Sequence, residues 1–529
     1  MSRMCSAKLS QLKGIDDDDG CGDGGSHYLL VDANFASNAR TAPTDFKPYP
    51  FRYHDVLEVE ITALTNEGDG IGRVEVSSDA GISKKWVVMV PQALPGELVE
   101  VKIYKNFASY SRGSLVRVIT PSSARREATC ALFGVCGGCQ YQHLAYDEQL
   151  RWKATQTRDL LVRITGLEPE VAEALVLPTV ASPHEYNYRT KLTPRYAIVS
   201  VESEDAAPSG DDIAIGFLAT AARSKLVDVR ECPIATAEIN AALPRRRAEL
   251  VGQLVADGVP ERARQGSLLF RHAVEAGRVV TEPSEVVTAE VEGIEMSFRA
   301  GDFFQNNPFI LPSLVKHVVG GARGHPPSSG TGTGGGADVD FLIDTYSGSG
   351  LFALCAARHF EQCIGVETFA SAVRNARANA ARNGLSNVQF VEGSAEQIFD
   401  AIDEQFVPAR SAVVVDPPRK GCDLAFLRQL VDYAPRRIVY VSCSPDTQAR
   451  DLKLLIGAGY ALRCLQPFDL FPQTRHVEAV ATLEWPEADQ CPSPTPLDVA
   501  QEGSARGTPR RYKRNDGRGR KRRSKRPRR

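Results

Sequence analysis

The sequence lacks long apolar segments. No stretch of its 529 residues approaches the roughly 18 consecutive apolar residues that a membrane-spanning helix requires. Its opening residues, MSRMCSAKLSQLKGIDDDDG, also lack the apolar part of a secretory signal. We therefore expect no membrane partner and a cytoplasmic or nuclear location. In such a compartment the 12 cysteines are expected to be thiols, metal ligands or catalytic groups rather than disulfides.

Acidic residues outnumber basic ones over most of the chain, and positive charge is concentrated near its C-terminus. Residues 506–529 contain 14 Lys or Arg and one acid, which leaves −15 for the rest of a chain whose net charge is −2. Such a segment is typical of a nucleic-acid-binding arm or a nuclear import signal, so it predicts RNA as a partner; a tail that only aids solubility is the alternative. We expect residues 487–529 and residues 1–53 to be disordered.

Periodicity divides the rest of the chain into three domains. Residues 54–120 contain about five short strands separated by turn residues, which predicts a small OB-type β-barrel. Residues 121–297 combine a cysteine-bearing segment, a helical stretch and mixed strands, which predicts a central α+β domain. In residues 298–486 apolar strands alternate with helices, which predicts an α/β domain with a doubly wound, mostly parallel sheet. A Gly/Pro/Ser-rich linker is expected at residues 320–338.

The α/β domain carries signs of a nucleoside site. Its first strand runs into DTYSGSGLFALCAA, where Gly348 and Gly350 let the backbone approach a ligand at the carboxyl edge of the sheet. The next strand ends at Glu367, which could accept hydrogen bonds from ribose hydroxyls or could be a solvated acid. The third glycine of a dinucleotide fingerprint is missing, which favours a mononucleoside cofactor over NAD.

The turn VDPPRKGCD follows a later strand of the same domain. Two prolines cannot continue a strand, so they fix a rigid turn that holds Asp416 and presents Arg419. Here the sequence resembles the Rossmann-type S-adenosylmethionine methyltransferases. In the members that methylate base amino groups an aromatic residue follows the two prolines. Arg419 occupies that place here, which argues against amino methylation.

Four motifs share the expected carboxyl edge: FRAGDFFQNNPF, DPPRKG, VSCSP and DLFPQTRHVEAVATL. In this order they resemble the motifs of the RNA uracil-5-methyltransferase family. Their residues are most similar to those of its eukaryotic, particularly fungal, tRNA branch. The resemblance covers about residues 54–486. It implies that the barrel is a TRAM domain and that S-adenosylmethionine is the methyl donor for C5 of a uracil, most simply uracil-54 in the T-loop of tRNA.

The resemblance also assigns roles to single residues. A lone Cys443 after an apolar strand would by itself suggest a packed thiol. Carbon 5 of uracil is a poor nucleophile, however, and addition of a thiolate to C6 activates it. The family pattern places Cys443 as this nucleophile and Glu478 as the base that removes the C5 proton. It places the cofactor contacts at Gln305, Tyr346, Glu367 and Asp416, and Asp416 would also face the uracil.

A second cysteine group lies in CALFGVCGGCQYQH. Cys130, Cys136 and Cys139 have the spacing C-x5-C-x2-C, which predicts a metal site and leaves zinc and an iron–sulfur cluster open. The family resemblance implies a [4Fe–4S] cluster with Cys232 as the fourth ligand. His143 could substitute as a ligand, although a polar residue at the surface is the expected interpretation.

Several alternatives stay open. Ribosomal RNA is the alternative substrate, and a non-catalytic RNA-binding protein is the alternative from another class. Radical methylthiotransferases use a C-x3-C-x2-C trio that is absent here, and cytosine-5-methyltransferases use a Pro-Cys pair where this chain has Ser442-Cys443. Many Rossmann methyltransferases carry an Asp after the third strand, and Ser394 is the candidate for that adenine contact. We expect a monomer, and packing roles for Cys355, Cys363, Cys422 and Cys464.

Overall fold

The computed structural model describes part of the chain. These parts are residues 42–77, 83–198, 210–220, 224–255, 265–324, 339–394, 398–399, 402 and 404–486. The N-terminal residues 1–41 and the basic tail 487–529, both expected to be disordered, lie outside the described residues. No helix in these described stretches is long and apolar enough to cross a bilayer.

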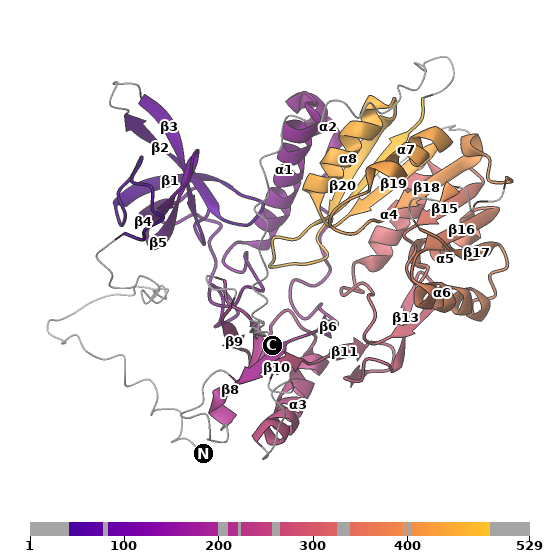
Figure 1. Ribbon diagram of the computed structural model, residues 1–529, viewed down its shortest axis with the longest axis horizontal. Coiled ribbons are helices and arrows are strands. Elements are labelled where there is room, and N and C mark those ends of the chain that lie inside the picture. Colours follow the sequence, from indigo (N-terminus) through magenta and orange to yellow (C-terminus); the bar gives the residue numbers. More distant parts are fainter. Residues whose placement is uncertain are drawn as a thin grey trace, which may run out of the picture.

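The N-terminal domain is a closed five-stranded barrel, drawn in indigo at one side of the molecule in Figure 1. Alternate residues of its strands point inward, and Val88, Val99 and Val101 are fully buried. The pairing is antiparallel except between β3 and β5, which run parallel and close the barrel. The strands are β1 (Val56–Leu64), β2 (Gly70–Ser77), β3 (Ser83–Val90), β4 (Leu98–Asn106) and β5 (Tyr110–Thr120).

Residues 42–53 correct the expectation of a disordered segment up to residue 53. Phe51 packs into the barrel core, and the Asn106 side chain donates hydrogen bonds to the carbonyls of Lys47 and Phe51, both at 2.7 Å. Tyr49 lies edge-on to Trp86 of β3. The aromatic residues of this stretch, which make most of these contacts, distinguish it from the polar residues that precede it.

The central part contains one long helix that joins it to the α/β domain. Helix α1 (Tyr146–Thr165) lies beside α8 (Pro445–Gly457), as Figure 1 shows. Leu161 of α1 belongs to the same apolar core as the sheet of the α/β domain. The other elements are α2 (Pro169–Leu175), β6 (Lys191–Leu192), β7 (Arg195–Ile198), β8 (Ile213–Leu218), β9 (Leu226–Asp228), α3 (Ala237–Val255), β10 (Gln265–Ser267), β11 (Phe270–Ala273) and β12 (Arg278–Val280).

The α/β domain is a seven-stranded sheet in the order β17-β16-β15-β18-β19-β21-β20. All pairs are parallel except those of β21, which runs antiparallel to both of its neighbours. Strands β15, β18 and β19 are wholly buried because helices cover both faces, which explains their continuous apolar runs. The strands are β15 (Phe341–Thr345), β16 (Gln362–Glu367), β17 (Val388–Glu392), β18 (Ser411–Val415), β19 (Arg437–Ser442), β20 (Ala461–Phe468) and β21 (Glu478–Glu484).

Two sequence-based boundaries of this domain differ from the structure. The hairpin of β13 (Val286–Val291) and β14 (Ile294–Arg299) packs into the core of the seven-stranded sheet, so a boundary at residue 298 falls inside β14. Helix α4 (Leu311–Arg323) continues through the first residues of the expected linker 320–338, because Gly321 packs closely against Thr482. The remaining helices are α5 (Leu351–Ala356), α6 (Ala370–Arg382) and α7 (Leu424–Tyr433).

Candidate active site

The carboxyl ends of four neighbouring strands bring the expected site residues to one edge of the sheet. Glu367 ends β16, Tyr346 follows β15, Asp416 follows β18 and Cys443 follows β19. These strands are adjacent in the order β16-β15-β18-β19. The edge is therefore continuous from the proposed cofactor residues to the cysteine, as expected for ligand sites in doubly wound sheets.

Glu478 reaches the same edge from the opposite chain direction. Ser442, the last residue of β19, pairs with Ala479 of the antiparallel β21. The next residue along β19 is Cys443, and the preceding residue of β21 is Glu478. The thiol and the carboxyl group are thus neighbours across two paired strands, although they lie 35 positions apart in the sequence.

The thiol of Cys443 lies in a half-buried, charged environment. Burial raises its pKa to about 11; the nearby acids Glu478 and Asp416 add to this rise, and Arg419 opposes it by charge and by a side-chain hydrogen bond. Cys443 also stands immediately before Ser444, the N-cap of α8, and the amide dipoles of a helix N-terminus favour a thiolate. Arg419 and the N-terminus of α8 both stabilise the thiolate form of Cys443.

The two carboxyl groups at this edge are stronger bases, when ionised, than exposed carboxylates. Burial raises the pKa of Glu478 well above its ordinary value, and the charge of Asp416 adds to that rise while Arg419 opposes it. Burial likewise raises the pKa of Asp416. A carboxylate with a raised pKa accepts a proton more readily than an exposed one. Glu478 is 5% exposed, so a proton that it accepts is shielded from bulk water.

The first βα turn of the sheet is built around Glu367. Its two carboxylate oxygens accept hydrogen bonds from the amides of Gly348, at 3.0 Å, and Phe369, at 2.9 Å. Tyr346 opens the turn at φ 61°, a conformation that is unfavourable for a bulky residue. Gly350 at φ 90° starts α5, and a Cβ atom there would lie 2.7 Å from the Phe390 ring. This strained turn leaves the backbone at the strand ends free for a ligand to approach.

Asp344 is a buried acid that the sequence analysis missed. Its side chain is fully buried in β15 and accepts a hydrogen bond of 3.0 Å from the amide of Ala353 in α5. Burial raises the pKa of Asp344 well above its ordinary value, and the charges of Asp416 and Glu367 add to the rise. The signal in the sequence was an acid inside the apolar strand FLIDT.

Gln305 lies in a segment that is fastened to the same region. The neighbouring Asn307 is fully buried, and its side chain donates to the carbonyl of Leu470 at 3.1 Å. Arg271 donates to the carbonyls of Ala300 and Asp302. Gln305 is partly buried between these anchors. Ser394, the candidate for the adenine contact, follows β17 and is partly buried.

The four cysteines expected to bind metal lie close to one another. Burial raises the pKa of Cys139 to about 12, and the charges of Cys232, Cys136 and Cys130 add to the rise. Across the described parts of the chain, however, no three His, Cys, Asp or Glu side chains are spaced to hold a metal ion. The structure therefore brings the thiols together without arranging them around a single ion.

His143 is buried, which corrects the expectation of a surface residue. It is 4% exposed, its Nε2 lies 3.1 Å from the carbonyl of Gln92, and its ring packs against Phe133. Burial lowers its pKa to about 3, so that the ring is neutral. The expectation of packing roles for four other cysteines is confirmed by their burial: Cys355, Cys363, Cys422 and Cys464.

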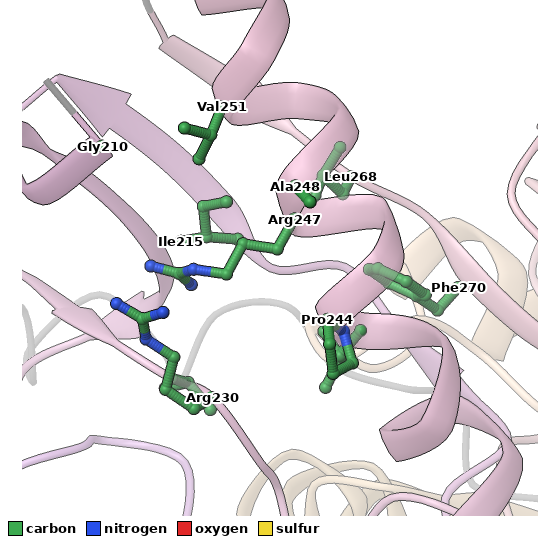
Figure 2. A pocket seen from close by; sticks show the side chains of 11 residues that line it. Gly210, Ile215, Arg230, Pro244, Arg247, Ala248, Val251, Leu268 and Phe270 are labelled. Atoms are coloured by element: carbon green, nitrogen blue, oxygen red, sulfur yellow. The ribbon is translucent and has the colours of Figure 1, made fainter. Parts of the chain in front are cut away.

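A separate apolar pocket of about 410 Å³ lies in the central domain (Figure 2). It is lined by residues of α3 and, from outside this helix, by Ile215 and Phe270 among others. Arg230 and Arg247 extend side by side at its border in Figure 2, and both pair with Asp228, at 2.9 and 2.5 Å. None of the proposed catalytic or cofactor residues lines this pocket.

Comparison with known proteins decides the family. The family described as tRNA (Uracil-5-)-methyltransferase matches residues 334–485, and the TRAM domain matches residues 54–116. A tRNA (uracil(54)-C(5))-methyltransferase of Schizosaccharomyces pombe is 37% identical over 456 residues, which cover 82% of this chain and 79% of the relative. The chain belongs to the tRNA (uracil-5-)-methyltransferase family. The prediction made from the four motifs is thereby confirmed.

Other relatives agree with this membership. A Saccharomyces cerevisiae tRNA (uracil(54)-C(5))-methyltransferase is 32% identical over 496 residues, 83% of this chain and 75% of that relative. The crystal structure of Pyrococcus abyssi tRNA (uracil-54, C5)-methyltransferase in complex with S-adenosyl-L-homocysteine matches 81% of this chain and 100% of that chain, with a TM-score of 0.58 and 23% identity. This likeness shows a common fold. It confirms the expected methyltransferase sheet and, with the TRAM match, the OB-type barrel.

Proposed function

We propose that this protein transfers a methyl group from S-adenosylmethionine to C5 of uracil-54 in tRNA. The observation that carries the proposal is the adjacency of Cys443 and Glu478 across β19 and β21, because the reaction needs a thiol nucleophile and a base at one carbon–carbon bond. Support for the substrate comes from the family and from the two yeast relatives, whose names specify uracil-54 of tRNA.

Cys443 starts the reaction by adding to the ring. Its thiolate forms an S–C6 bond, and the electrons of the C5–C6 double bond move toward C5 and O4 as an enolate. S-adenosylmethionine, when bound, supplies an electrophilic methyl group on a cationic sulfur. The C5 carbon takes this methyl group, so that a C5–CH3 bond forms while the S–CH3 bond breaks and its electron pair stays on the sulfur. Arg419 holds the thiol before addition.

Glu478 completes the reaction by removing the proton from C5. The C5–H electrons re-form the C5–C6 double bond, and the C6–S bond breaks with its electrons returning to Cys443. The raised pKa of Glu478, caused by burial and by Asp416, suits a group that must accept a proton from carbon. The methylated RNA leaves, and Cys443 is regenerated in the site.

Gln305, Tyr346, Glu367 and Asp416 are the residues that we propose to hold the cofactor. Glu367 ends β16, where a carboxylate can accept hydrogen bonds from ribose hydroxyls while its remaining lone pairs hold the glycine turn. Tyr346 and Asp416 flank it on the adjacent strands β15 and β18. Asp416 stands between this group and Cys443, where it can also contact the uracil.

Cys130, Cys136, Cys139 and Cys232 are the ligands that we propose for a [4Fe–4S] cluster. Their mutual effect on pKa supports their proximity. The described residues contain no group of three or more side chains arranged to hold a metal ion, so the proposal is supported by the spacing of the cysteines and the proximity of their thiols. The cluster would brace the chain around it.

Two further proposals concern the whole chain. We propose that it acts as a monomer, and that the basic segment 506–529 contacts RNA and is compatible with nuclear import. The membrane has no part in the proposed reaction.

The test of the proposed function is a map of 5-methyluridine in RNA from cells that lack the protein. We expect the modification to disappear at position 54 of tRNA and to stay in ribosomal RNA. If 5-methyluridine is lost from ribosomal RNA but kept in tRNA, ribosomal RNA is the substrate instead. If 5-methyluridine is kept in both RNAs, the proposed activity is contradicted. The purified protein with an unmodified tRNA transcript and S-adenosylmethionine provides the direct assay.

A further inference from the structure

The loop between β20 and β21 carries the chain into Glu478 and is held from outside the α/β domain. We call residues 469–477 the catalytic loop. Its central residue, Gln473, is buried and adopts φ 68°, which costs energy for a residue with a side chain. The amides of Gln140 and Tyr141 both donate to the Gln473 carbonyl at 3.0 Å, and the Gln473 amide donates to the Gln149 side chain at 3.0 Å. The surrounding segment imposes this conformation.

One of these partners also reaches the cysteine segment. The Gln140 side chain accepts a hydrogen bond of 3.2 Å from the amide of Arg475, three residues before Glu478. Its Nε2 donates at 3.0 Å to the carbonyl of Gly137, which lies between Cys136 and Cys139. A single amide group therefore joins the loop of cysteines to the catalytic loop, and Gln140 is the residue directly after Cys139.

We propose that Gln140 is a positioning residue through which the cysteine segment sets the placement of Glu478. The inference rests on the proposed function, because it assumes that Glu478 is the base. It assigns the cysteines a task in a reaction that does not use them chemically. When they are held together, Gly137 and Gln140 are fixed, and the catalytic loop is fixed with them.

The link acts on one half of the reaction. Cys443 follows β19, an interior strand that is held by β18 on one side as well as by β21 on the other, so we expect addition to C6 to be much less sensitive to Gln140 than proton removal is. Proton removal requires Glu478 within hydrogen-bond distance of the C5 proton, and a displacement of about 1 Å can cost about 100-fold in rate. Disturbing Gln140 should therefore slow release of the methylated RNA without slowing its capture.

The experiment compares Gln140→Ala with Gln389→Ala in the full-length protein. Gln389 is an exposed glutamine on the edge strand β17 and serves as the matched control. An unmodified tRNA transcript and S-adenosylmethionine are added, and the covalent protein–RNA species is followed on denaturing gels. We expect Gln140→Ala to form this species at a rate within about twofold of the unaltered protein, and to release it about 10- to 100-fold more slowly. Gln389→Ala should match the unaltered protein in both steps.

Glu478→Gln in the same assay separates the two ideas. If Glu478→Gln releases product normally, the proposed base is wrong and the proposed function fails at that step. If Glu478→Gln stalls while Gln140→Ala releases product at the unaltered rate, the proposed base stands and the link through Gln140 is overturned. Equal slowing of capture and release by Gln140→Ala would also overturn it, because that pattern reports general damage.

Hydrogen exchange tests the mechanical part of the link. Gln140→Ala should increase amide exchange in residues 469–477 and leave β19 unchanged. Cys139→Ser should increase exchange in the same loop, and the double variant should add nothing further, because both changes break one connection. Independent, additive increases would contradict the proposed path from the cysteines to the catalytic loop.

Discussion

Lys153 and Asp469 form an ion pair of 2.6 Å in which neither side chain is exposed to solvent. Lys153 belongs to α1, and Asp469 is the first residue of the catalytic loop. Burial lowers the pKa of the lysine and raises the pKa of the aspartate, and each effect is opposed by the partner's charge. The pair thus joins the central domain to the catalytic loop at a point where an unpaired charge would be costly.

Removing one member of this pair should be more harmful than removing both. Lys153→Met leaves a buried carboxylate without its partner, and we expect a loss of about 3–5 kcal/mol in the free energy of unfolding. Adding Asp469→Leu should restore much of this loss. Urea denaturation measures both. As a control, Arg245→Met breaks an exposed pair with Glu249 and should cost less than about 1 kcal/mol. A double variant as unstable as Lys153→Met would contradict the role of the buried charge.

Cys443→Ala and Glu478→Gln should fail at different steps. Cys443→Ala should bind tRNA yet form no covalent species, because no S–C6 bond can form. Glu478→Gln should add its thiol and transfer the methyl group, then retain the RNA as a slowly migrating band on a denaturing gel. Ordinary loss of a base lowers the rate by about 10²- to 10⁴-fold without trapping an intermediate. A covalent band that survives in the double variant would contradict the assignment of Cys443.

The thiol of Cys443 should react more slowly than a free cysteine at neutral pH. Its pKa is raised to about 11 by burial and by Glu478 and Asp416, so the thiolate fraction in the free protein rises about tenfold per pH unit up to that value. Alkylation by iodoacetamide, followed by mass spectrometry of the peptide that contains residue 443, measures this. Arg419→Ala removes a cation that lowers the pKa and should slow alkylation. The neighbouring Lys420→Ala should leave it unchanged.

The basic segment should govern the salt dependence of RNA binding. Deleting residues 506–529 removes 14 cationic side chains. The slope of log K against log salt should become shallower by about 0.7–0.9 for each phosphate group that the shortened protein no longer binds. Filter binding of tRNA at several salt concentrations gives the slope. If the slope is unchanged, the segment does not bind RNA phosphates and its role is limited to nuclear targeting.

The proposed cluster predicts a brown, oxygen-sensitive protein with about four iron atoms per chain. Anaerobic purification followed by elemental analysis measures the iron content. Cys232→Ala should lower it and weaken tRNA binding more than it slows methyl transfer. Zinc in place of iron would contradict the identity of the bound group.

The sequence predicted that the site residues share one edge of the sheet because each of them is marked by its local sequence. Asp416 and Cys443 each follow a short apolar strand, and parallel strands of a doubly wound sheet bring their carboxyl ends together. The four motifs, in their order along the chain, then gave the family resemblance that assigned a role to Glu478. Cys443 alone would have been interpreted as a packed thiol.

The connections that support this edge were not predicted because they join distant parts of the chain. Gln140 meets Arg475 across 335 positions, and Lys153 meets Asp469 across 316. A glutamine in the cysteine-bearing segment and a lysine in a helical pattern carry no sign of such partners. His143 was placed at the surface for the same reason, since its neighbours Gln92 and Phe133 become neighbours only after folding.

The reversed direction of β21 determines which changes of chain length this enzyme can tolerate. Because β21 enters the sheet at the catalytic edge, its first residue is Glu478, and the loop before it is held by the buried Gln473, so extra residues in the middle of that loop would disturb the contacts that place Glu478. One residue inserted at the start of the strand has a different effect. It would shift the pairing by one position and turn the acid toward the opposite face of the sheet. Natural length variation in relatives should accordingly gather in surface turns and avoid the start of this strand.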